Sequence, residues 1–488
     1  MQQESLKNKT IKGVGWSAAD AFLGQGVTFI VGLVLARLLS PDEYGLIGIC
    51  LIFTTVLNGI VDSGFSNALI RKKEVTDEDY NTMFITNMVI SIVLYVILFI
   101  CAPLVSEFFH REELTALVRA TGLILFFNAL SITQVTILTK EINFKTKTKA
   151  SFVSAVISGV IGIAMAFMGY GVWALVAQQL SKQLFYTICL WFLNKWCPKF
   201  TFYKKSFKYM WGFGWKLLAS GILNNVWNQL YQVVIGRFYS PATLGQYTRA
   251  QEYAGLCSQN LTTIVQRVTF PVLSELQDDK KKLLVSYRKL VKVSMFVTVI
   301  CMFALGAMAE PMIFSLIGSQ WHQAATFLPF ICITMSLYPL HAINLNMLQV
   351  QGRSDLFLYL EIVKKINSLI PIFIGVFVGV YWMLCASIFT GFIAFLLNSW
   401  FTGKFLNYSS WQQLKDVLPS YLIAFFIGFI VYLLKFLPLS FNLIFPLQIL
   451  ATIIVGWIVN QIVNLEEYCE IKNIVQTVIK KYGKKFNH

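Results

Sequence analysis

The sequence predicts an all-α integral membrane protein with about fourteen transmembrane helices, arranged as two parallel six-helix repeats followed by two C-terminal helices. Three observations support this fold class. The composition is too apolar for a soluble domain, apolar segments of about 20 residues recur along the chain, and two short signatures each occur twice. Both termini are predicted to be cytoplasmic.

The composition and the placement of charge exclude most soluble classes. Of 488 residues, 56% are hydrophobic and only 13% are charged, and the mean hydropathy is +0.64, whereas a soluble domain has roughly 25% charged residues. The net charge of +16 would also suit a nucleic-acid binder, but the basic residues fall in alternate loops, as in membrane proteins. We therefore expect membrane lipids, and no nucleic acid, among the partners.

Cysteines and nucleotide motifs give no sign of a cofactor. The nine cysteines are scattered, mostly within apolar segments, without a Cys-x-x-Cys pair or a neighbouring His, so neither a disulfide framework nor a metal site is expected. No Walker-type Gly-x-x-x-x-Gly-Lys sequence occurs, which argues against an ATPase.

Apolar windows and their breaks place the individual helices. The first six are predicted at 12–37, 45–68, 83–105, 115–138, 150–169 and 172–193. The second six are predicted at 211–237, 246–274, 291–317, 325–349, 364–380 and 382–402, and the added pair at 418–436 and 445–463. The predicted domains are therefore a six-helix lobe at 1–205, a second lobe at 206–405, and two helices with a basic cytoplasmic tail at 406–488.

The distribution of Lys and Arg sets the orientation. With a cytoplasmic N-terminus, most of the 40 Lys and Arg residues fall in cytoplasmic segments, as the positive-inside rule requires. The opposite loops then hold only Arg37, Arg111 and Arg237, with Arg119 and Lys435 at their edges.

Two signatures define the repeat. The tetrapeptide Gly-x-Gly-Trp opens the first predicted helix at 13–16 and the seventh at 212–215. The pattern Arg-x-x-Ser-Pro-x-x-x-Gly closes the same helices at 37–45 and, 200 residues later, at 237–245. Because an even number of helices separates the copies, the repeats have the same orientation and are related by an axis along the membrane normal.

Polar residues at membrane depth face a protein interior or a water-filled cavity, so they are the first candidates for function. The first helix has a polar, glycine-rich face that includes Asp20, Gly24, Gln25 and Thr28. The seventh helix has five amides at i, i+1, i+4, i+5 and i+8, which share one face and suit sugar hydroxyls. They are Asn224, Asn225, Asn228, Gln229 and Gln232.

Cations within the predicted helices indicate an anionic substrate. Helices six and seven contribute Lys182 and Lys216, and helix eight carries Arg249 and Arg267 on one side together with Asn260 and Thr263. Arg binds phosphate through its planar fork and Lys as a point charge. We therefore predict that these four cations and the five amides bind substrate.

Two acids placed well inside the helices, Asp20 and Glu252, are the candidates for cation coupling. Several alternatives remain open at this stage. Lys216 and Arg249 could snorkel from helix ends, Arg267 could lie at the cytoplasmic surface, and Asp20 could pair with a nearby cation.

Three segments resemble a known family: ARLLSPDEYG at 36–45, DSGFSNALI at 62–70 and FPVLSELQDD at 270–279. They resemble the polysaccharide transporter branch of the multidrug/oligosaccharidyl-lipid/polysaccharide (MOP) flippase superfamily, the Wzx-type exporters of colanic-acid-like repeat units. The resemblance covers nearly the whole chain.

The resemblance implies a multi-pass protein of the bacterial inner membrane that moves undecaprenyl-diphosphate-linked oligosaccharide, a repeat unit of capsule, exopolysaccharide or O-antigen, to the outer leaflet. Alternating access between two lobes, driven by a gradient of H⁺ or Na⁺, is the implied mechanism. The implied partners are the lipid-linked oligosaccharide and the polysaccharide polymerase and export machinery.

Two other functions are weighed against this one. A drug exporter of the same superfamily should have acids rather than bases dominating its lumen. A membrane enzyme such as a glycan polymerase should have a large outer loop with catalytic His, Asp or Arg, whereas the longest outer loop here is about ten residues, which leaves little room for chemistry. We therefore assign no catalytic and no metal-binding residue.

Overall fold

The computed structural model describes residues 23–62 and 64–472, apart from a few side chains inside helices. Every regular element in this described part is helical, so the predicted all-α class is confirmed. Nine helical segments among these residues are long and apolar enough to cross a bilayer, as expected of a multi-pass membrane protein. The signature at 13–16 and Asp20 lie outside the described residues.

The chain divides into two compact units, Met1–Gly245 and Gln246–His488. The predicted boundaries at 205 and 405 were drawn from the sequence repeat, whereas this division follows compactness. After an apolar helix at Leu23–Leu38, the first unit contains α2 (Pro41–Asp62), α3 (Phe65–Arg71), α4 (Asp77–Phe109), α5 (Glu113–Lys140), α6 (Phe144–Phe167), α7 (Val172–Leu193) and α8 (Lys204–Phe238).

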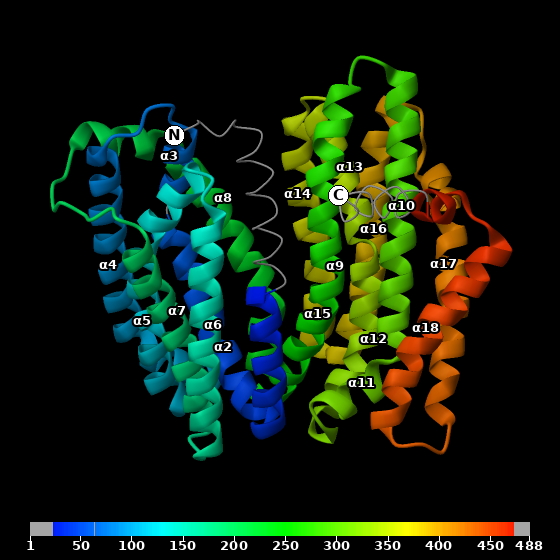
Figure 1. The fold of residues 1–488 in the computed structure, drawn as a ribbon, viewed down its shortest axis with the longest axis horizontal. Helices are drawn as coiled ribbons and strands as arrows, with labels where there is room; N and C mark the ends of the chain where they lie inside the picture. The colour runs from blue at the N-terminus through cyan, green and yellow to red at the C-terminus, as the bar shows by residue number, and fades with distance from the viewer. Residues whose placement is uncertain (1–22, 63, 473–488) are drawn as a thin grey trace, which may run out of the picture. The chain divides into compact units, whose positions relative to one another are not determined.

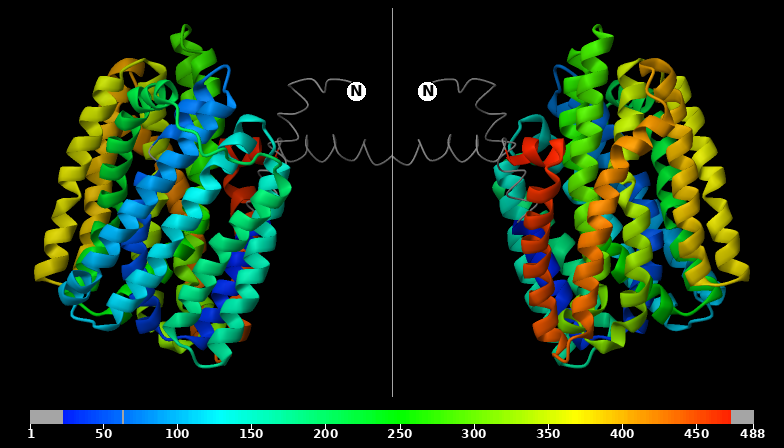
Figure 2. Two further views of the ribbon diagram at one scale, coloured as in Figure 1. Left: turned by 90° about the vertical axis from the view of Figure 1, so that its left-hand side faces the viewer. Right: turned by 90° about the vertical axis from the view of Figure 1, so that its right-hand side faces the viewer.

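The first unit is a bundle in which consecutive helices run alongside one another (Figures 1 and 2). Helix α4 packs on α5, α6 packs on α7, and α5 also contacts α2 and α7. Because α5 is enclosed by these neighbours, it buries polar residues such as Thr121, Ser131 and Gln134. The hydroxyl of Thr121 donates to the carbonyl of Leu117 one turn earlier, which satisfies it without a partner helix.

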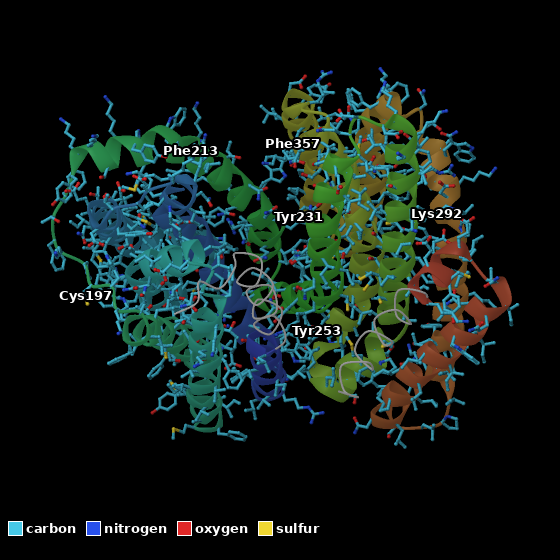
Figure 3. All side chains as sticks on the ribbon, turned by 45° about the horizontal axis from the view of Figure 1, so that its top comes forward. Cys197, Phe213, Tyr231, Tyr253, Lys292 and Phe357 are labelled. Atoms are coloured by element: carbon cyan, nitrogen blue, oxygen red, sulfur yellow. The ribbon has the colours of Figure 1, made fainter. Side chains whose placement is uncertain are left out.

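Helix α8 begins seven residues before its predicted start at residue 211. In Figures 1 and 3 its first part runs across one end of the unit, and the helix then turns to descend. The early turns carry Lys204 and Lys205 next to aromatic residues, a composition suited to the membrane interface. Gly212 and Gly214 lie in the part of the helix where the direction changes, and glycine pairs favour such bends.

Four predicted spans, 45–68, 291–317, 325–349 and 364–380, are each divided between two helices. Two of these divisions have clear local reasons. The predicted span 45–68 is divided between α2 and α3, because Gly64 adopts the left-handed conformation (φ 67°) at the start of α3. A Cβ on Gly64 would also lie 2.8 Å from the carbonyl oxygen of Gly214. The predicted span 325–349 is divided at Leu337, two residues before Pro339, because proline cannot supply an interior helical hydrogen bond.

The helices of the second unit follow in the same manner. They are α9 (Pro241–Glu275), which starts just before the division, α10 (Lys280–Ala307), α11 (Ala309–Leu316), α12 (His322–Ser336), α13 (Tyr338–Val350), α14 (Ser354–Asn367), α15 (Leu369–Phe377), α16 (Val380–Leu406), α17 (Ser410–Leu433) and α18 (Phe441–Val463), with short 3₁₀ turns at Ser319–Trp321 and Leu434–Phe436.

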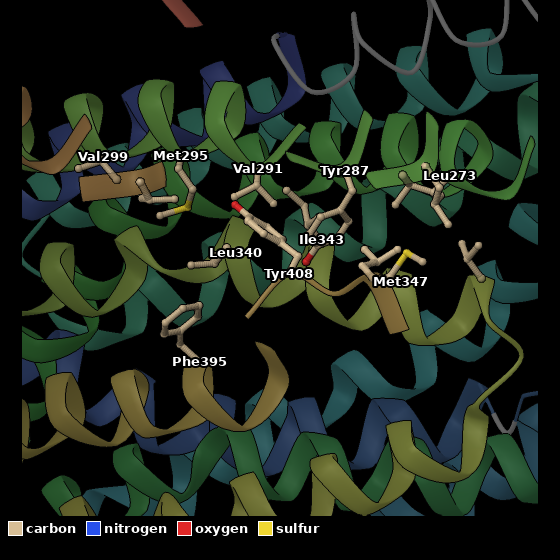
Figure 4. Packing of buried hydrophobic residues seen from close by; sticks show 14 of the residues in the cluster. Leu273, Tyr287, Val291, Met295, Val299, Leu340, Ile343, Met347, Phe395 and Tyr408 are labelled. Carbon is tan, nitrogen blue, oxygen red and sulfur yellow. The ribbon is translucent and has the colours of Figure 1, made fainter. Parts of the chain in front are cut away.

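The core of the second unit is a cluster between α9, α10, α13, α16 and α17. Tyr287 and Tyr408 meet edge to face at its centre, with ring centroids 6.0 Å apart, and Leu273, Met295 and Met347 surround them (Figure 4). The Tyr408 hydroxyl donates to Asp416, 2.5 Å away. Aromatic packing and one charged hydrogen bond therefore fix the turn between α16 and α17.

The duplicated Arg-x-x-Ser-Pro-x-x-x-Gly signatures meet in space. In both copies the helix starts at the proline, and the preceding serine hydroxyl accepts from a main-chain N–H three residues on, at Glu43 and at Thr243. A Cβ on Gly45 would lie 1.7 Å from the carbonyl oxygen of Pro241, and one on Gly245 would lie 2.0 Å from that of Pro41. The contact is reciprocal and leaves no room for a side chain on either glycine.

Candidate functional site

The helices chosen for their polar residues differ from the other long helices. Helices α7, α8 and α9 each have 22 or more residues, yet none of them is among the nine apolar spans of the described chain. Polar groups lower their hydropathy. Such groups are costly at membrane depth unless they face protein or water, so these helices are where a polar path is expected.

Lys182 extends from the middle of α7 toward the first helix. Its Nζ donates to the hydroxyl oxygen of Thr28 at 3.1 Å, and Thr28 in turn donates to the carbonyl of Gly24 at 2.9 Å. Both side chains are half-buried. The predicted polar face of the first helix therefore does approach the predicted cation. Asp20 lies outside the described residues.

The five amides of α8 are divided between two environments. They lie in the descending part of the helix, where Figure 3 labels Tyr231. Asn224 and Asn228 are exposed, whereas Asn225, Gln229 and Gln232 are half-buried. The stripe predicted as one binding face is thus partly a packing face.

Asn225 and Gln229 show what packing does to this stripe. A Cβ on Gly59 of α2 would lie 2.4 Å from Nδ2 of Asn225, so this amide rests on the α2 backbone. The Oε1 of Gln229 is buried without a hydrogen-bond partner among the described residues, and such a buried acceptor normally requires a partner such as water or a ligand.

Lys216, in the first half of α8, is exposed. Its ammonium is therefore accessible, either to solvent, to a lipid headgroup or to a substrate. The preceding residue, Trp215, is exposed as well, with 46% of its surface accessible.

Arg249 and Glu252 form an ion pair. The Nη1 of Arg249 donates to Oε2 of Glu252 at 2.6 Å, and the two side chains are 9% and 47% exposed. The guanidinium is therefore buried against the protein. The residue predicted to bind substrate and the residue predicted to couple a cation contact each other directly.

The rest of the predicted ladder on α9 is more open. Asn260 and Thr263 are exposed, and each donates to the carbonyl four residues earlier in its own helix. The side chain of Arg267 lies outside the described part of the structure. Gln246, near the start of α9, makes two hydrogen bonds to the chain around the start of α12. Its Nε2 donates to the carbonyl of Gln320, and its Oε1 accepts from the N–H of Ala324.

Sequence reasoning missed a second polar set, which joins α2, α5 and α7. Asn128 donates to Asn58 at 2.8 Å, Gln183 donates to Ser131 at 3.2 Å, and Asn194 donates to Gln134 at 2.6 Å. The missed signal was the recurrence of amides and hydroxyls within apolar helices, which normally pair between helices.

His341 on α13 is a half-buried polar residue. Its Nδ1 lies 3.2 Å from Nδ2 of Asn398 on α16, and Oδ1 atoms of Asn344 and Asn398 are buried without a partner in the described chain. No cluster of three or more His, Cys, Asp or Glu side chains suited to a metal occurs among the described residues.

The charge pattern between the end of α5 and the first turns of α9 is one-sided. Between Glu141 and Glu252, every charged residue is basic. Those residues are Lys145, Lys147, Lys149, Lys182, Lys195, Lys199, Lys204, Lys205, Lys208, Lys216, Arg237 and Arg249. A long stretch of one sign produces a positive potential that attracts anions.

Comparison with known families decides the classification. The family described as "Polysaccharide biosynthesis protein" matches residues 34–326, more than half of the chain. The chain belongs to the polysaccharide biosynthesis protein family. Its matched part covers all of α2 to α11 and includes Lys182, the α8 amides and the Arg249–Glu252 pair.

Curated relatives of this chain have low sequence identity, but their alignments cover most of each chain. The succinoglycan biosynthesis transport protein ExoT of Rhizobium meliloti is 26% identical over 68% of each chain. The teichuronic acid biosynthesis protein TuaB of Bacillus subtilis is 23% identical over 88% of this chain and 89% of its own. The lipopolysaccharide biosynthesis protein WzxC of Escherichia coli K12 is 24% identical over 76% of each chain.

Solved structures share the fold. The lipid II flippase MurJ, in an inward closed conformation, aligns with a TM-score of 0.70 over 93% of this chain and 100% of its own, at 16% identity. An inward-facing multidrug resistance transporter of the MATE family and the MOP superfamily aligns with a TM-score of 0.60 over 79% of this chain and 99% of its own, at 14% identity. The chain therefore shares the fold of these two transporters.

Proposed function

We propose that this protein is a flippase that moves undecaprenyl-diphosphate-linked oligosaccharide across the bacterial inner membrane by alternating access, coupled to H⁺ or Na⁺. The family and its relatives support a role in moving polysaccharide precursors, because one relative is named a transport protein and one structural neighbour a lipid II flippase. No cofactor is assigned to the transport step.

The run of basic residues from Lys145 to Arg249 is the observation that carries the proposal. A diphosphate joined to acidic or neutral sugars is an anion, and Lys and Arg are the side chains that bind it. Lys182, Lys216, Arg249 and Arg267 are the proposed contacts. An exporter of cationic drugs would repel its substrate with the same residues.

The exposed amides of α8 are proposed to hold the glycan. Asn224 and Asn228 are exposed, so their donors and acceptors are available to sugar hydroxyls. Asn225, Gln229 and Gln232 are half-buried and are proposed to contact the substrate only where their amides reach the surface. The prenyl tail remains among the membrane lipids.

The contact between Arg249 and Glu252 suggests how coupling works. While the carboxylate accepts from the guanidinium, the positive charge of Arg249 is largely neutralised. A proton or Na⁺ bound at Glu252 weakens that pair and leaves the guanidinium available to the substrate diphosphate. Asp20 is the second proposed coupling group. The polysaccharide polymerase and export machinery are the proposed downstream partners.

The test is depletion of the protein in a bacterium that needs it for a surface polysaccharide. We expect lipid-linked oligosaccharide to accumulate on the cytoplasmic face, measured by its accessibility to an impermeant glycosidase in spheroplasts and in inverted vesicles. No accumulation, together with increased sensitivity to cationic drugs, would favour a drug exporter.

Complementation with variants tests the residues. Lys182→Ala and Asn228→Ala should each lower export while leaving the amount of protein unchanged. Lys415→Ala is the matched control, because Lys415 is an exposed lysine on α17 outside the proposed site. Full export by both Lys182→Ala and Lys216→Ala would contradict the cationic path.

A further inference from the structure

A shallow groove lies between α6 and α7 on the surface of the first unit. It has a volume of about 350 Å³ and is lined by Lys149, Phe152 and Val153 of α6 and by Cys189, Phe192 and Leu193 of α7. The α6 residues stand at i, i+3 and i+4, and so do the α7 residues, so each helix contributes one face.

The floor of the groove is tightly packed, whereas its walls are exposed. Beneath it, Leu138, Ala150 and Leu190 form a fully buried cluster against which Cys189 packs. On the walls, Phe192 is 88% exposed and Leu193 is 48% exposed. The groove is therefore a fixed indentation in an apolar surface, shaped to receive a flexible apolar chain.

Lys149 supplies a charge at one end of the groove. It is exposed, and no ion pair between it and a described carboxylate is present. Lys149 lies one helical turn before Phe152 in the sequence. Lys145 is close to it in the sequence, and Lys195 and Lys199 follow α7. Neither α6, α7 nor the segment between α7 and α8 contains an Asp or a Glu.

We propose that this groove binds an anionic phospholipid of the surrounding bilayer, with an acyl chain between α6 and α7 and the phosphate at Lys149. An apolar trough that ends in an uncompensated cation matches both parts of such a lipid. The groove differs from the proposed substrate contacts Lys182, Lys216, Arg249 and Arg267, because Lys149 is not one of them and does not lie on the same helices.

Native mass spectrometry of the full-length protein in detergent tests the proposal. The probes are dioleoyl phosphatidylglycerol, which is anionic, and dioleoyl phosphatidylcholine, which has the same chains and no net charge. We expect the wild type to retain phosphatidylglycerol preferentially. Lys149→Ala should weaken that retention about fivefold without changing phosphatidylcholine, and Lys149→Arg should restore it.

Two further variants separate the groove from general charge. Lys415→Ala, which removes an exposed lysine from the second unit, should retain phosphatidylglycerol as the wild type does. Val153→Trp, which fills the groove, should weaken both lipids, with unchanged thermal unfolding showing that the fold is intact. Equal losses in Lys149→Ala and Lys415→Ala would overturn the proposal. Displacement of phosphatidylglycerol by equimolar undecaprenyl phosphate would also overturn it, by assigning the groove to the prenyl lipid.

Discussion

At the scale of single residues, Arg249 and Glu252 show how burial determines the role of a charge. Residue spacing placed both on one side of α9, but it did not indicate which of them is buried or that they touch. Burial of the guanidinium and exposure of the carboxylate make the two members of the pair unequal, because an ion loses more when it is left buried than when water can solvate it.

This inequality predicts the stability of two variants. Glu252→Gln removes the carboxylate that pairs with a buried guanidinium, so it should lower the unfolding temperature. Because Glu252 is partly exposed, the expected loss in the free energy of unfolding is only about 1 kcal/mol. Arg249→Met leaves a carboxylate that water reaches and should cost less. Thermal unfolding of the purified variants in detergent measures both.

The exposed pair Arg353–Asp355 is the matched control, since its side chains are 45% and 63% exposed. Arg353→Met and Asp355→Asn should have equally small effects. If Arg249→Met destabilised the protein more than Glu252→Gln, the buried member of the pair would have been misassigned.

The glycines at the crossing give a second prediction at this scale. Gly45→Ala and Gly245→Ala should each destabilise the protein by at least about 1–3 kcal/mol, because the added Cβ would overlap a proline carbonyl. Gly221→Ala is the control, since nothing lies within 4 Å of a Cβ there and alanine is the better helix former. Comparable unfolding temperatures for all three variants would contradict the close contact.

At the scale of helices, the sequence predicts some elements well and others poorly for identifiable reasons. The range predicted for the helix at 172–193 coincides with α7, because Gly171 and Asn194 bound a continuous apolar segment. The start of α8 was placed late, because its first turns are amphipathic and basic, and hydropathy windows recognise only uniformly apolar helices. Amphipathicity has to be searched for separately at membrane interfaces.

The candidate site was predictable to the same limited degree. The sequence marks Lys182 only as a cation within an apolar helix, and it does not indicate the contact of its Nζ with Thr28 on the first helix. It did not separate Asn225, which packs on Gly59, from the exposed Asn228. That distinction depends on the neighbouring helix α2, which periodicity within α8 does not describe.

The turn between α16 and α17 yields a pH prediction. Burial, and then the hydrogen bond to Asp416, raises the pKa of Tyr408 above its ordinary value. A raised pKa means that the neutral phenol stabilises the fold below about pH 10, the unfolded value, and that this contribution is lost as pH rises toward the folded value. Tyr408→Phe should therefore cost about 1.5–3 kcal/mol near pH 8.

The difference between wild type and Tyr408→Phe should then narrow between pH 10 and pH 11, because only the wild type has this phenol to ionise on unfolding. Thermal unfolding in detergent across pH 8–11 measures it. A difference that stays constant over this range would mean that the hydroxyl contributes nothing through its protonation state.

At the scale of the whole molecule, the placement of Lys and Arg predicts the orientation in the membrane. Cys197 is exposed and lies between Lys195 and Lys199, so it should be cytoplasmic. In a variant with Cys197 as its sole cysteine, an impermeant maleimide should label inverted vesicles and leave intact spheroplasts unlabelled. Figure 3 shows Cys197 at the edge of the first unit.

The matched variant is His110→Cys in a cysteine-free background, because His110 is exposed at the turn between α4 and α5, which is predicted to lie on the outer side. It should be labelled in spheroplasts only. Reversal of the two patterns would place both termini outside and would reverse the direction assigned to transport.

The reciprocal contact of Gly45 and Gly245 also makes the two copies of the signature depend on each other. When equivalent positions of two copies touch each other, each patch binds its own duplicate, as in an isologous interface. Here both copies lie on one chain, so each contact needs its own glycine, and a side chain at either position would push apart the same pair of helices.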